Sequence, residues 1–195
     1  MAETNGFHST MNGIKLNMIV AMCKNRGIGC KNKIPWRLKK EMAFFSFITK
    51  KSEDPDKQNV VVMGRKTYEG IPKKFFPLAN RINIILSKSM PNAPEGAHLA
   101  RDLKEAIDLF QNGSIKDKVN KLFIIGGSGV YQEVLESNYD IRLYLTRIHA
   151  DFDVDVFFPE FESKQYKELN NVEDVPSEEQ EENGTKWTYH VYERC

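Results

Sequence analysis

The sequence is poor in cysteine and contains no long apolar run. Its three cysteines, Cys23, Cys30 and Cys195, are an odd number without the spacing of a metal site. Such a set is typical of a protein in a reducing compartment and argues against a disulfide framework. No stretch approaches the roughly 18 apolar residues that a membrane-spanning helix needs. We therefore expect a cytoplasmic protein with no metal site and no membrane segment.

The chain also lacks an excess of either charge. It has 28 Lys and Arg against 27 Asp and Glu, a net charge of +1, so no global field favours nucleic acid or an anionic membrane. Basic residues do crowd the segment 31–40 and recur at Lys73 and Lys74. They are either a rim that attracts an anion or ordinary solubilising residues, and the sequence leaves both open.

Residues 1–15 lack the apolar core of a signal peptide and the arginine-rich pattern of a transit peptide. We interpret them as a flexible extension and residues 16–195 as one domain. A domain of this length can bury a large core. A content of 41% hydrophobic and 28% charged residues is typical of a soluble globular protein.

Apolar runs of strand length alternate with helical segments in the first part of the chain. The runs are continuous, which suits strands buried on both faces of a sheet. They cover residues 16–23, 60–63, 82–86 and 122–125. A short strand near 97–100 leads to a helix from Asp102, a suitable N-cap, to about Gln111. This alternation favours an α/β fold with a parallel sheet.

The pattern changes from Ile141 onward. Residues 141–148 alternate between apolar and polar, as do residues near the C-terminus, and an acidic segment between them ends in Asn183-Gly184. The Asn-Gly pair is a hairpin signal. We therefore expect an antiparallel hairpin added to the edge of the parallel sheet.

The segment from residue 27 to 48 joins a loop to a helix. Gly27 and Gly29 are expected to supply positive φ angles in the loop, and Pro35 fixes φ near its end. From Arg37 the spacing predicts a helix whose apolar face carries Leu38, Met42, Phe45 and Ile48.

Glu41 stands beside this face, between Leu38 and Phe45. Burial would disfavour its charged form and raise its pKa unless it meets a polar ligand or a proton. That makes Glu41 a candidate for chemistry. The alternative is that Glu41 pairs with Arg37, four residues earlier, on a solvated face, and the segment alone does not separate the two.

Two turns lead from an apolar strand into a helix, at residues 64–67 and at residues 126–129. A helix N-terminus offers free backbone N–H groups and the positive end of the dipole, and glycines let a phosphate approach that backbone. Neither turn is a Walker motif or a G-x-G-x-x-G fingerprint. The alternative for the second turn is a tight turn that needs positive φ. Two such turns in one domain favour a ligand with two phosphate groups.

Eight motifs in this sequence resemble those of the dihydrofolate reductase family and keep that family's order over about residues 16–193. They are I-V-A (19–21), G-I-G with I-P-W (27–29, 34–36), M-G-R-K-T (63–67), I-P (71–72), R-I-N with L-S (81–83, 86–87), I-G-G-S-G-V-Y (125–131), T-R-I (146–148) and F-F-P-E (157–160). The glutamate at position 41 resembles the active-site residue of the family's non-bacterial branch. The linker at 37–40 lacks the prolines that many relatives carry.

The resemblance implies a single α/β domain with a central, mostly parallel sheet of about eight strands, a C-terminal antiparallel hairpin and about four flanking helices. It implies catalytic roles for Glu41, Thr146 and Trp36, with the first two gripping the aminopyrimidine edge of a pterin. It also implies a cis peptide between Gly126 and Gly127. The residues implied at the substrate are Val20, Ala21, Leu38, Met42, Phe45, Ile71, Arg81, Ile125 and Tyr131.

The implied cofactor is NADPH, with its pyrophosphate between the two turns and its 2′-phosphate beside basic residues that follow strands. The implied cofactor residues are Ala21, Ile28, Gly29, Gly64, Arg65, Lys66, Thr67, Leu86, Ser87, Lys88, Arg101, Gly126, Gly127, Ser128, Gly129, Val130 and Tyr131. Within the substrate set, Arg81 would hold the glutamate α-carboxylate of the folate, because an arginine binds carboxylates bidentately.

The leading hypothesis is therefore an enzyme that reduces 7,8-dihydrofolate to 5,6,7,8-tetrahydrofolate with NADPH and is blocked by antifolates such as methotrexate. By the same resemblance we expect a monomer. A second hypothesis is a reductase of a deaminopyrimidine, as in riboflavin synthesis, but that class lacks the P-W loop and the carboxylate after it. A third is a binding or regulatory protein that keeps the fold without turnover.

Overall fold

The computed structural model describes residues 13–161 and 163–195. The expected extension over residues 1–15 therefore lies almost entirely outside the described residues. The strands are β1 (Lys15–Met22), β2 (Gly27–Gly29), β3 (Gln58–Gly64), β4 (Ile82–Leu86), β5 (Ala97–Ala100), β6 (Val119–Ile124), β7 (Asp140–Ile148), β8 (Val156–Phe157), β9 (Tyr166–Leu169), β10 (Gln180–Glu182) and β11 (Thr185–Arg194). The α-helices are α1 (Lys39–Lys50), α2 (Arg65–Gly70), α3 (Leu103–Gln111) and α4 (Ser128–Glu136), and short 3₁₀ turns occur at Lys24–Arg26, Lys73–Phe75, Lys116–Lys118 and Ser163–Gln165.

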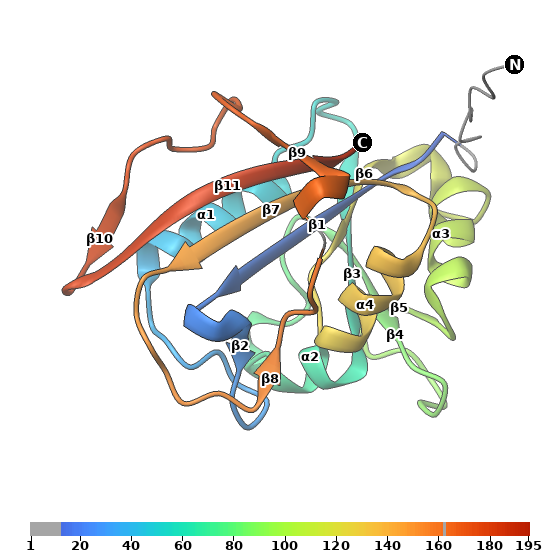
Figure 1. Ribbon diagram of the computed structural model, residues 1–195. Helices are drawn as coiled ribbons and strands as arrows, with labels where there is room; N and C mark the ends of the chain where they lie inside the picture. The colour runs from blue at the N-terminus through green and yellow to red at the C-terminus, as the bar shows by residue number, and fades with distance from the viewer. Residues whose placement is uncertain (1–12, 162) are drawn as a thin grey trace, which may run out of the picture.

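One large sheet forms the centre of the molecule, with the order β10-β11-β7-β1-β6-β3-β4-β5 and β9 paired to β11 (Figure 1). Every contact from β7 through β5 along this order is parallel. Strand β11 runs antiparallel to β7, β9 and β10. The predicted fold class is thus confirmed, including the hairpin, in which Asn183 and Gly184 both have positive φ between β10 and β11.

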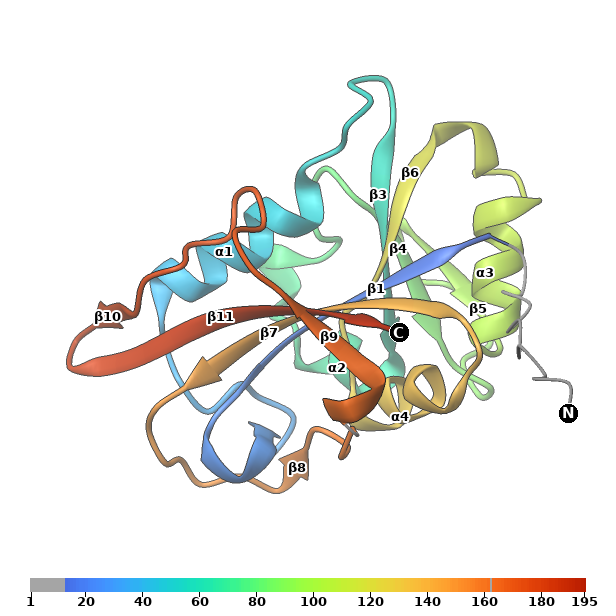
Figure 2. The same ribbon diagram turned by 45° about the horizontal axis from the view of Figure 1, so that its top comes forward.

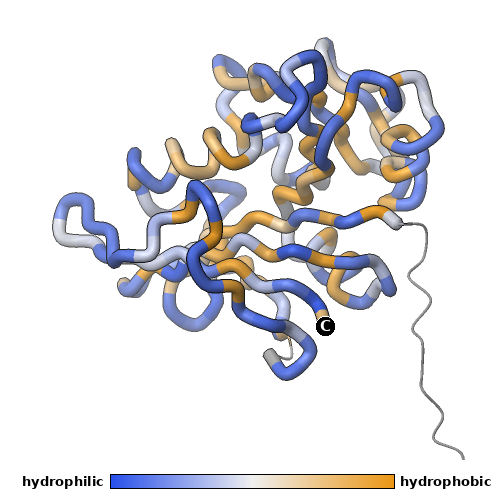
Figure 3. The backbone as a smooth tube through the Cα atoms, turned by 90° about the horizontal axis from the view of Figure 1, so that it is seen from above, coloured by the Kyte–Doolittle hydropathy of each residue, from blue (hydrophilic) through white to orange (hydrophobic). Residues whose placement is uncertain are grey.

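Helices cover both faces of this sheet (Figures 1 and 2). On one face, alternate residues of β1 pack with α3 and α4 in a cluster that includes Leu16, Met18, Leu103 and Val134. On the other face, Ile19 joins a second cluster that contains Ile48 of α1. Burial on both faces explains why the central strands read as continuous apolar runs. Figure 3 shows orange, hydrophobic segments along these strands and mostly blue, hydrophilic loops around them.

Local signals account for several boundaries. Asp102 caps α3 as predicted, because its carboxylate accepts a hydrogen bond from the Glu105 N–H at 2.8 Å. Strand β3 begins earlier than its apolar run, at Gln58, and its buried Asn59 donates to the carbonyls of Thr49 and Lys51. The carboxyl end of α1 is thereby bound to the core of the sheet.

None of the helices in the described residues is both long and apolar enough to cross a bilayer. The three cysteines are free, with Cys23 buried and Cys195 exposed.

Candidate active site

Glu41 lies in the first turn of α1, on the side of the helix that packs against the sheet. Helix α1 begins at Lys39 rather than at Arg37, because Leu38 has an extended backbone with φ −114° and ψ 104°. Glu41 is only 6% exposed, whereas Met42, expected on the apolar face, is 46% exposed. The interpretation of Glu41 as the solvated partner of Arg37 is therefore wrong. A carboxylate occupies a position of α1 that faces the core.

The partner of this carboxylate comes from β7: the hydroxyl of Thr146 donates to Glu41 Oε1 at 3.2 Å. Among the described residues, Glu41 forms no ion pair with a cation. Burial raises the pKa of Glu41 from its ordinary value of 4.5 to about 7, and the hydrogen bond from Thr146 opposes that rise. A carboxyl group with this pKa exchanges a proton readily near neutral pH.

Several aromatic side chains lie on the elements next to Glu41: the segment before α1, α1 itself and β11. Trp36 is buried in a cluster with Leu38 and Trp187, and the Trp36 indole N–H has no hydrogen-bond partner among the described residues. On β11, Tyr189 lies opposite Thr146 in the antiparallel register, so both side chains share one face of the sheet. The ring centroids of Tyr189 and Phe44 are 3.9 Å apart.

The sequence did not reveal this group of aromatic residues, in which Tyr189 lies near Glu41, Phe44 packs on Tyr189 and Trp187 packs in the cluster of Trp36. Burial raises the pKa of Tyr189 to about 12, and the nearby charge of Glu41 adds a smaller effect in the same direction. The signal for Trp187 and Tyr189 was the alternation of the last strand, which places both on the face that α1 covers. Without the register against β7, nothing in the sequence connects them to Glu41.

Arg81 lies beside α1 and contacts Thr49, eight residues along the helix from Glu41. Its Nη1 donates to Thr49 Oγ1 at 2.8 Å, its Nε donates to the Ala79 carbonyl at 3.1 Å, and its guanidinium lies 5.9 Å from the centre of the Phe45 ring. Arg81 is 9% exposed, and burial lowers its pKa. No carboxylate pairs with it among the described residues. A buried cation without a counter-ion fits an anionic ligand.

The other residues predicted at the substrate are divided between the two faces of the sheet. Leu38 is buried beside Trp36, Ala21 packs against the same cluster, and Ile71 and Ile125 are half-buried on the α1 face. The side chains of Val20 and Tyr131 belong instead to the cluster on the opposite face. Val20 can therefore reach the site only through its backbone.

The two strand-to-helix turns lie side by side at the carboxyl ends of β3 and β6. The Gly64 N–H donates to the Gly126 carbonyl at 2.7 Å, and the peptide between Gly126 and Gly127 is cis. Gly126 has φ +117°, and a Cβ on Gly127 would lie 3.2 Å from Thr67 Oγ1. Neither α2 nor α4 has a side-chain N-cap. The N-termini of these two helices, without side-chain caps, therefore lie at two turns that are hydrogen-bonded to each other.

The side chains of α4 in this region have partners of their own. Ser128 Oγ donates to the Phe157 carbonyl at 2.6 Å, and the Tyr131 hydroxyl donates to the Ile19 carbonyl at 2.7 Å. Burial raises the pKa of Tyr131. A Cβ on Gly129 would meet none of the described residues within 4 Å, and Val130 is half-buried.

Basic residues gather at the ends of the three neighbouring strands β3, β4 and β5. Arg65 follows β3 and donates to Ser89 Oγ at 3.3 Å, and Arg101 follows β5 and donates to the carbonyls of Ser87 and Met90 at 3.1 and 2.7 Å. Both arginines therefore contact the turn after β4, which also carries the exposed Lys88. The Ser87 hydroxyl accepts from the Met90 N–H at 3.1 Å within that turn. Leu86 is buried at the end of β4, and Lys66 is exposed on α2.

The segment with Ile28 and Gly29 is not all loop, because residues 27–29 form β2, which pairs with β8. The expected positive φ at Gly27 and Gly29 is wrong; Gly27 has φ −66°, and Gly29 is not among the positive-φ residues. A Cβ on Gly27 would instead lie 2.6 Å from Val154 and 2.8 Å from Cys23 Sγ. Close packing explains the glycine at 27.

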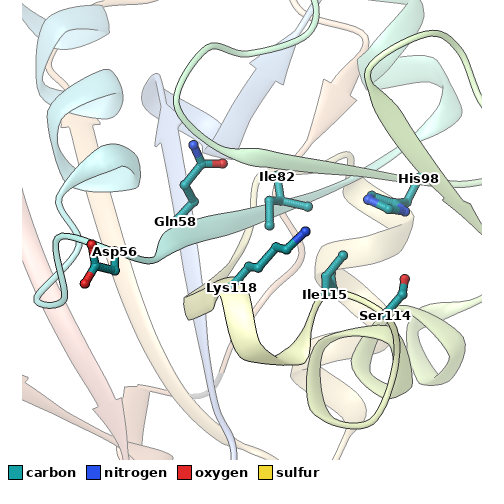
Figure 4. A pocket seen from close by; sticks show the side chains of 7 residues that line it. All are labelled: Asp56, Gln58, Ile82, His98, Ser114, Ile115 and Lys118. Atoms are coloured by element: carbon teal, nitrogen blue, oxygen red, sulfur yellow. The ribbon is translucent and has the colours of Figure 1, made fainter.

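A separate hollow of about 570 Å³ lies at the amino ends of the parallel strands (Figure 4). Glu41 is not among its lining residues, and ligands of open α/β sheets usually collect at the opposite, carboxyl ends of the strands. Its lining residues are Asp56, Gln58, Ile82, His98, Ser114, Ile115 and Lys118.

Comparison with known proteins identifies the same family across nearly the whole chain. A family model described as dihydrofolate reductase matches residues 15–194. Dihydrofolate reductase of Sus scrofa is 45% identical over 181 residues, covering 92% of this chain and 97% of that protein. The Drosophila melanogaster enzyme is 42% identical over 183 residues, covering 93% and 98%. Schistosoma mansoni dihydrofolate reductase superposes with a TM-score of 0.84 at 39% identity, covering 93% and 99%.

Proposed function

The chain belongs to the dihydrofolate reductase family, and from this premise we propose how its residues reduce 7,8-dihydrofolate with NADPH. The reaction adds a hydride to the imine carbon of the pterin and a proton to the adjacent ring nitrogen. When bound, the reduced nicotinamide supplies the hydride. The remaining tasks fall to the protein: binding and orienting the pterin, polarising it, and excluding water.

Glu41 binds the pterin. The observation that carries this assignment is a buried carboxyl group with a hydroxyl partner, Thr146, and no cation among the described residues. Its carboxylate accepts hydrogen bonds from the amino and ring N–H groups of the aminopyrimidine edge, which restores the partners that burial removed. This binding polarises the ring system. Water, rather than Glu41 itself, delivers the proton to the ring nitrogen, because Glu41 lies at the edge of the pterin away from that nitrogen in the family's geometry.

The apolar residues of α1 and its neighbours hold the rest of the folate. Leu38 immediately precedes the helix, Met42 and Phe45 lie on it, and Ile71 follows α2. The exposed Met42 side chain is available to pack on a ligand. Arg81 receives the glutamate α-carboxylate, an anion that its buried guanidinium lacks within the described residues.

The donor set at the strand ends fits a phosphorylated nicotinamide dinucleotide. The N-termini of α2 and α4 offer N–H groups to a pyrophosphate at Gly64 and Gly127. Arg65, Lys88 and Arg101 offer cations to a 2′-phosphate. We expect each exposed cation to contribute about 0.5–1 kcal/mol, so the three together give NADPH an advantage of about ten- to a hundredfold over NADH.

The activity assignment is tested by Glu41→Gln, which keeps the shape of the side chain and removes the anion. Dihydrofolate reduction at neutral pH should fall by about a hundredfold or more, while the affinity for NADPH stays near the wild-type value. Glu133→Gln, on the exposed side of α4, is the matched control. Wild-type turnover in Glu41→Gln would remove Glu41 from the mechanism. Methotrexate, whose diaminopteridine ring also offers N–H donors to a carboxylate, should lose affinity for Glu41→Gln as well.

The cofactor assignment has its own test. Replacing Arg65, Lys88 and Arg101 with glutamine in one variant should bring the dissociation constants of NADPH and NADH together, with the NADH value unchanged. Added salt should reduce the wild-type preference, since exposed pairs are screened. A triple variant that still prefers NADPH by the wild-type factor would place the 2′-phosphate elsewhere.

A further inference from the structure

Helix α1 has no N-cap of its own. Its N-cap position is Leu38, whose side chain accepts no hydrogen bond. The two helical residues that follow are Lys39 and Lys40, and lysine side chains carry only donors. The first intrahelical bond is donated by Met42 to the Leu38 carbonyl at 3.1 Å. The N–H groups before Met42 therefore need an acceptor from elsewhere in the molecule.

Glu182 provides that acceptor from the other end of the chain. Its Oε1 accepts from the Lys39 N–H at 3.0 Å, and its Oε2 accepts from the Lys40 N–H at 2.9 Å. The Lys40 ammonium also donates to the Glu181 carbonyl at 3.0 Å. These backbone bonds lower the pKa of Glu182, so it is ionised at neutral pH. Because the Glu182 carboxylate is bound to the N–H groups of Lys39 and Lys40, its negative charge also lies at the positive end of the α1 dipole.

The sheet fixes Glu182 relative to the rest of the site. Glu182 is the last residue of β10 and pairs with Thr185 of β11 across the turn at Asn183 and Gly184. Strand β11 in turn pairs with β7, the strand that carries Thr146. Glu182, which binds the N–H groups of Lys39 and Lys40, and Thr146, which binds Glu41, thus come from one continuous antiparallel unit of three strands. Figure 1 shows β10 and β11 passing close to the first turn of α1.

The two ends of α1 differ in how they are held. At the carboxyl end, the buried Asn59 binds the carbonyls of Thr49 and Lys51, and Lys51 also forms ion pairs with Glu173 and Asp174. At the amino end, Glu182 is the one side chain in the described residues that accepts from the helix N–H groups. The acidic segment therefore contacts both ends, but only the amino end depends on it for capping.

We propose that Glu182 is a positioning residue, which caps α1 and thereby holds Glu41 in the first turn against Thr146. This inference rests on the proposed function of Glu41. Without the cap, the first turn would fray, and Glu41 would spend part of its time away from the buried position where it meets the pterin. Glu182 itself touches no reacting atom.

The test compares Glu182→Gln with Glu181→Gln. Both variants lose one negative charge at neighbouring positions, but only Glu182 offers its side chain to the helix, because Glu181 contributes its backbone carbonyl. Glutamine at 182 keeps one acceptor and turns an N–H donor toward the second helix N–H. We expect kcat/KM for dihydrofolate to fall about two- to fivefold in Glu182→Gln, the range for a charge at a helix terminus. The KM for NADPH should not change.

Two further measurements separate positioning from general stability. Amide hydrogen exchange of the free protein should speed up at residues 39–42 in Glu182→Gln and stay at the wild-type rate in Glu181→Gln. The double variant Glu173→Gln, Asp174→Asn breaks the ion pairs at the carboxyl end of α1. That end lies about 18 Å along the helix from Lys39, and the double variant should keep the wild-type kcat/KM.

The outcomes decide the proposal. Equal kcat/KM for Glu182→Gln and Glu181→Gln, with equal exchange at residues 39–42, would overturn it. An equal loss of kcat/KM in the carboxyl-end double variant would also overturn it, because the segment would then act as a general stabiliser. A wild-type protein without dihydrofolate-dependent turnover would instead overturn the proposed function, while the exchange rates would still decide whether Glu182 caps α1.

Discussion

Because Glu41 is buried, the stability of the protein should depend on pH in a way that one substitution removes. Its pKa is about 7 in the folded state, against 4.5 ordinarily, with burial as the main cause. Between these two values, the folded state binds more protons than the unfolded state. The contribution of Glu41 to the free energy of unfolding should therefore be highest below pH 4.5 and should be lost as the pH rises through about 7.

The size of this effect follows from the two pKa values. A difference of about 2.5 in pKa corresponds to about 3 kcal/mol. This is the amount by which the ionised Glu41 destabilises the fold above pH 7, relative to its protonated form. Glu41→Gln cannot ionise, so it should lack this loss. Its stability relative to wild type should improve by about 3 kcal/mol between pH 4 and pH 8.

The assay is denaturant-induced unfolding of wild type, Glu41→Gln and the control Glu133→Gln at pH 4 and pH 8. The difference between Glu41→Gln and wild type should change with pH, whereas the difference between the control and wild type should not. Subtracting the two pH values removes any constant cost of the substitution. A difference for Glu41→Gln that is the same at both pH values would refute the claim that burial raises the pKa of Glu41.

Three further predictions follow from the contacts around the site. Arg81→Ala should weaken dihydrofolate binding about ten- to a hundredfold, because a charge-assisted pair of about 1.5–3 kcal/mol is lost. Binding of a substrate without the glutamate tail should not change, and an equal loss on both substrates would make Arg81 structural. Thr146→Val should raise the pKa of Glu41 further, as followed by NMR titration, while Thr146→Ser should retain the wild-type value; an unchanged pKa in the valine variant would show that the 3.2 Å hydrogen bond has no effect. In Gly70→Ala, the new Cβ would lie 2.3 Å from the Asn32 carbonyl, so the loop at residues 30–36 should move. We expect a lower kcat/KM and faster hydrogen exchange in that loop, and wild-type exchange there would mean that the loop does not depend on this contact.

Features set by local chemistry were predictable from the sequence. The apolar runs became the parallel strands because both of their faces are buried, and Asn183-Gly184 made the expected hairpin turn. Asp102 capped its helix through its own side chain. In each case, the residues that decide the structure are neighbours in the chain.

Features that depend on distant contacts were not predictable. Gly27 is required by Val154 and Cys23 rather than by its own φ angle. The cap of α1 comes from Glu182, 143 residues after Lys39. Tyr189 reaches the Glu41 face only through the register of β11 on β7. Glu41 itself was a candidate from its position beside an apolar face, but the choice between burial and a pair with Arg37 needed the packing of α1 on the sheet.

The central claim is that this chain reduces dihydrofolate at the Glu41 site, and product analysis tests it most directly. The purified wild-type protein, given NADPH and 7,8-dihydrofolate, should form one tetrahydrofolate for each NADPH consumed, and methotrexate should stop both changes. A deaminopyrimidine of riboflavin synthesis should give no turnover. Consumption of NADPH with the deaminopyrimidine and not with dihydrofolate, or with neither, would contradict the account.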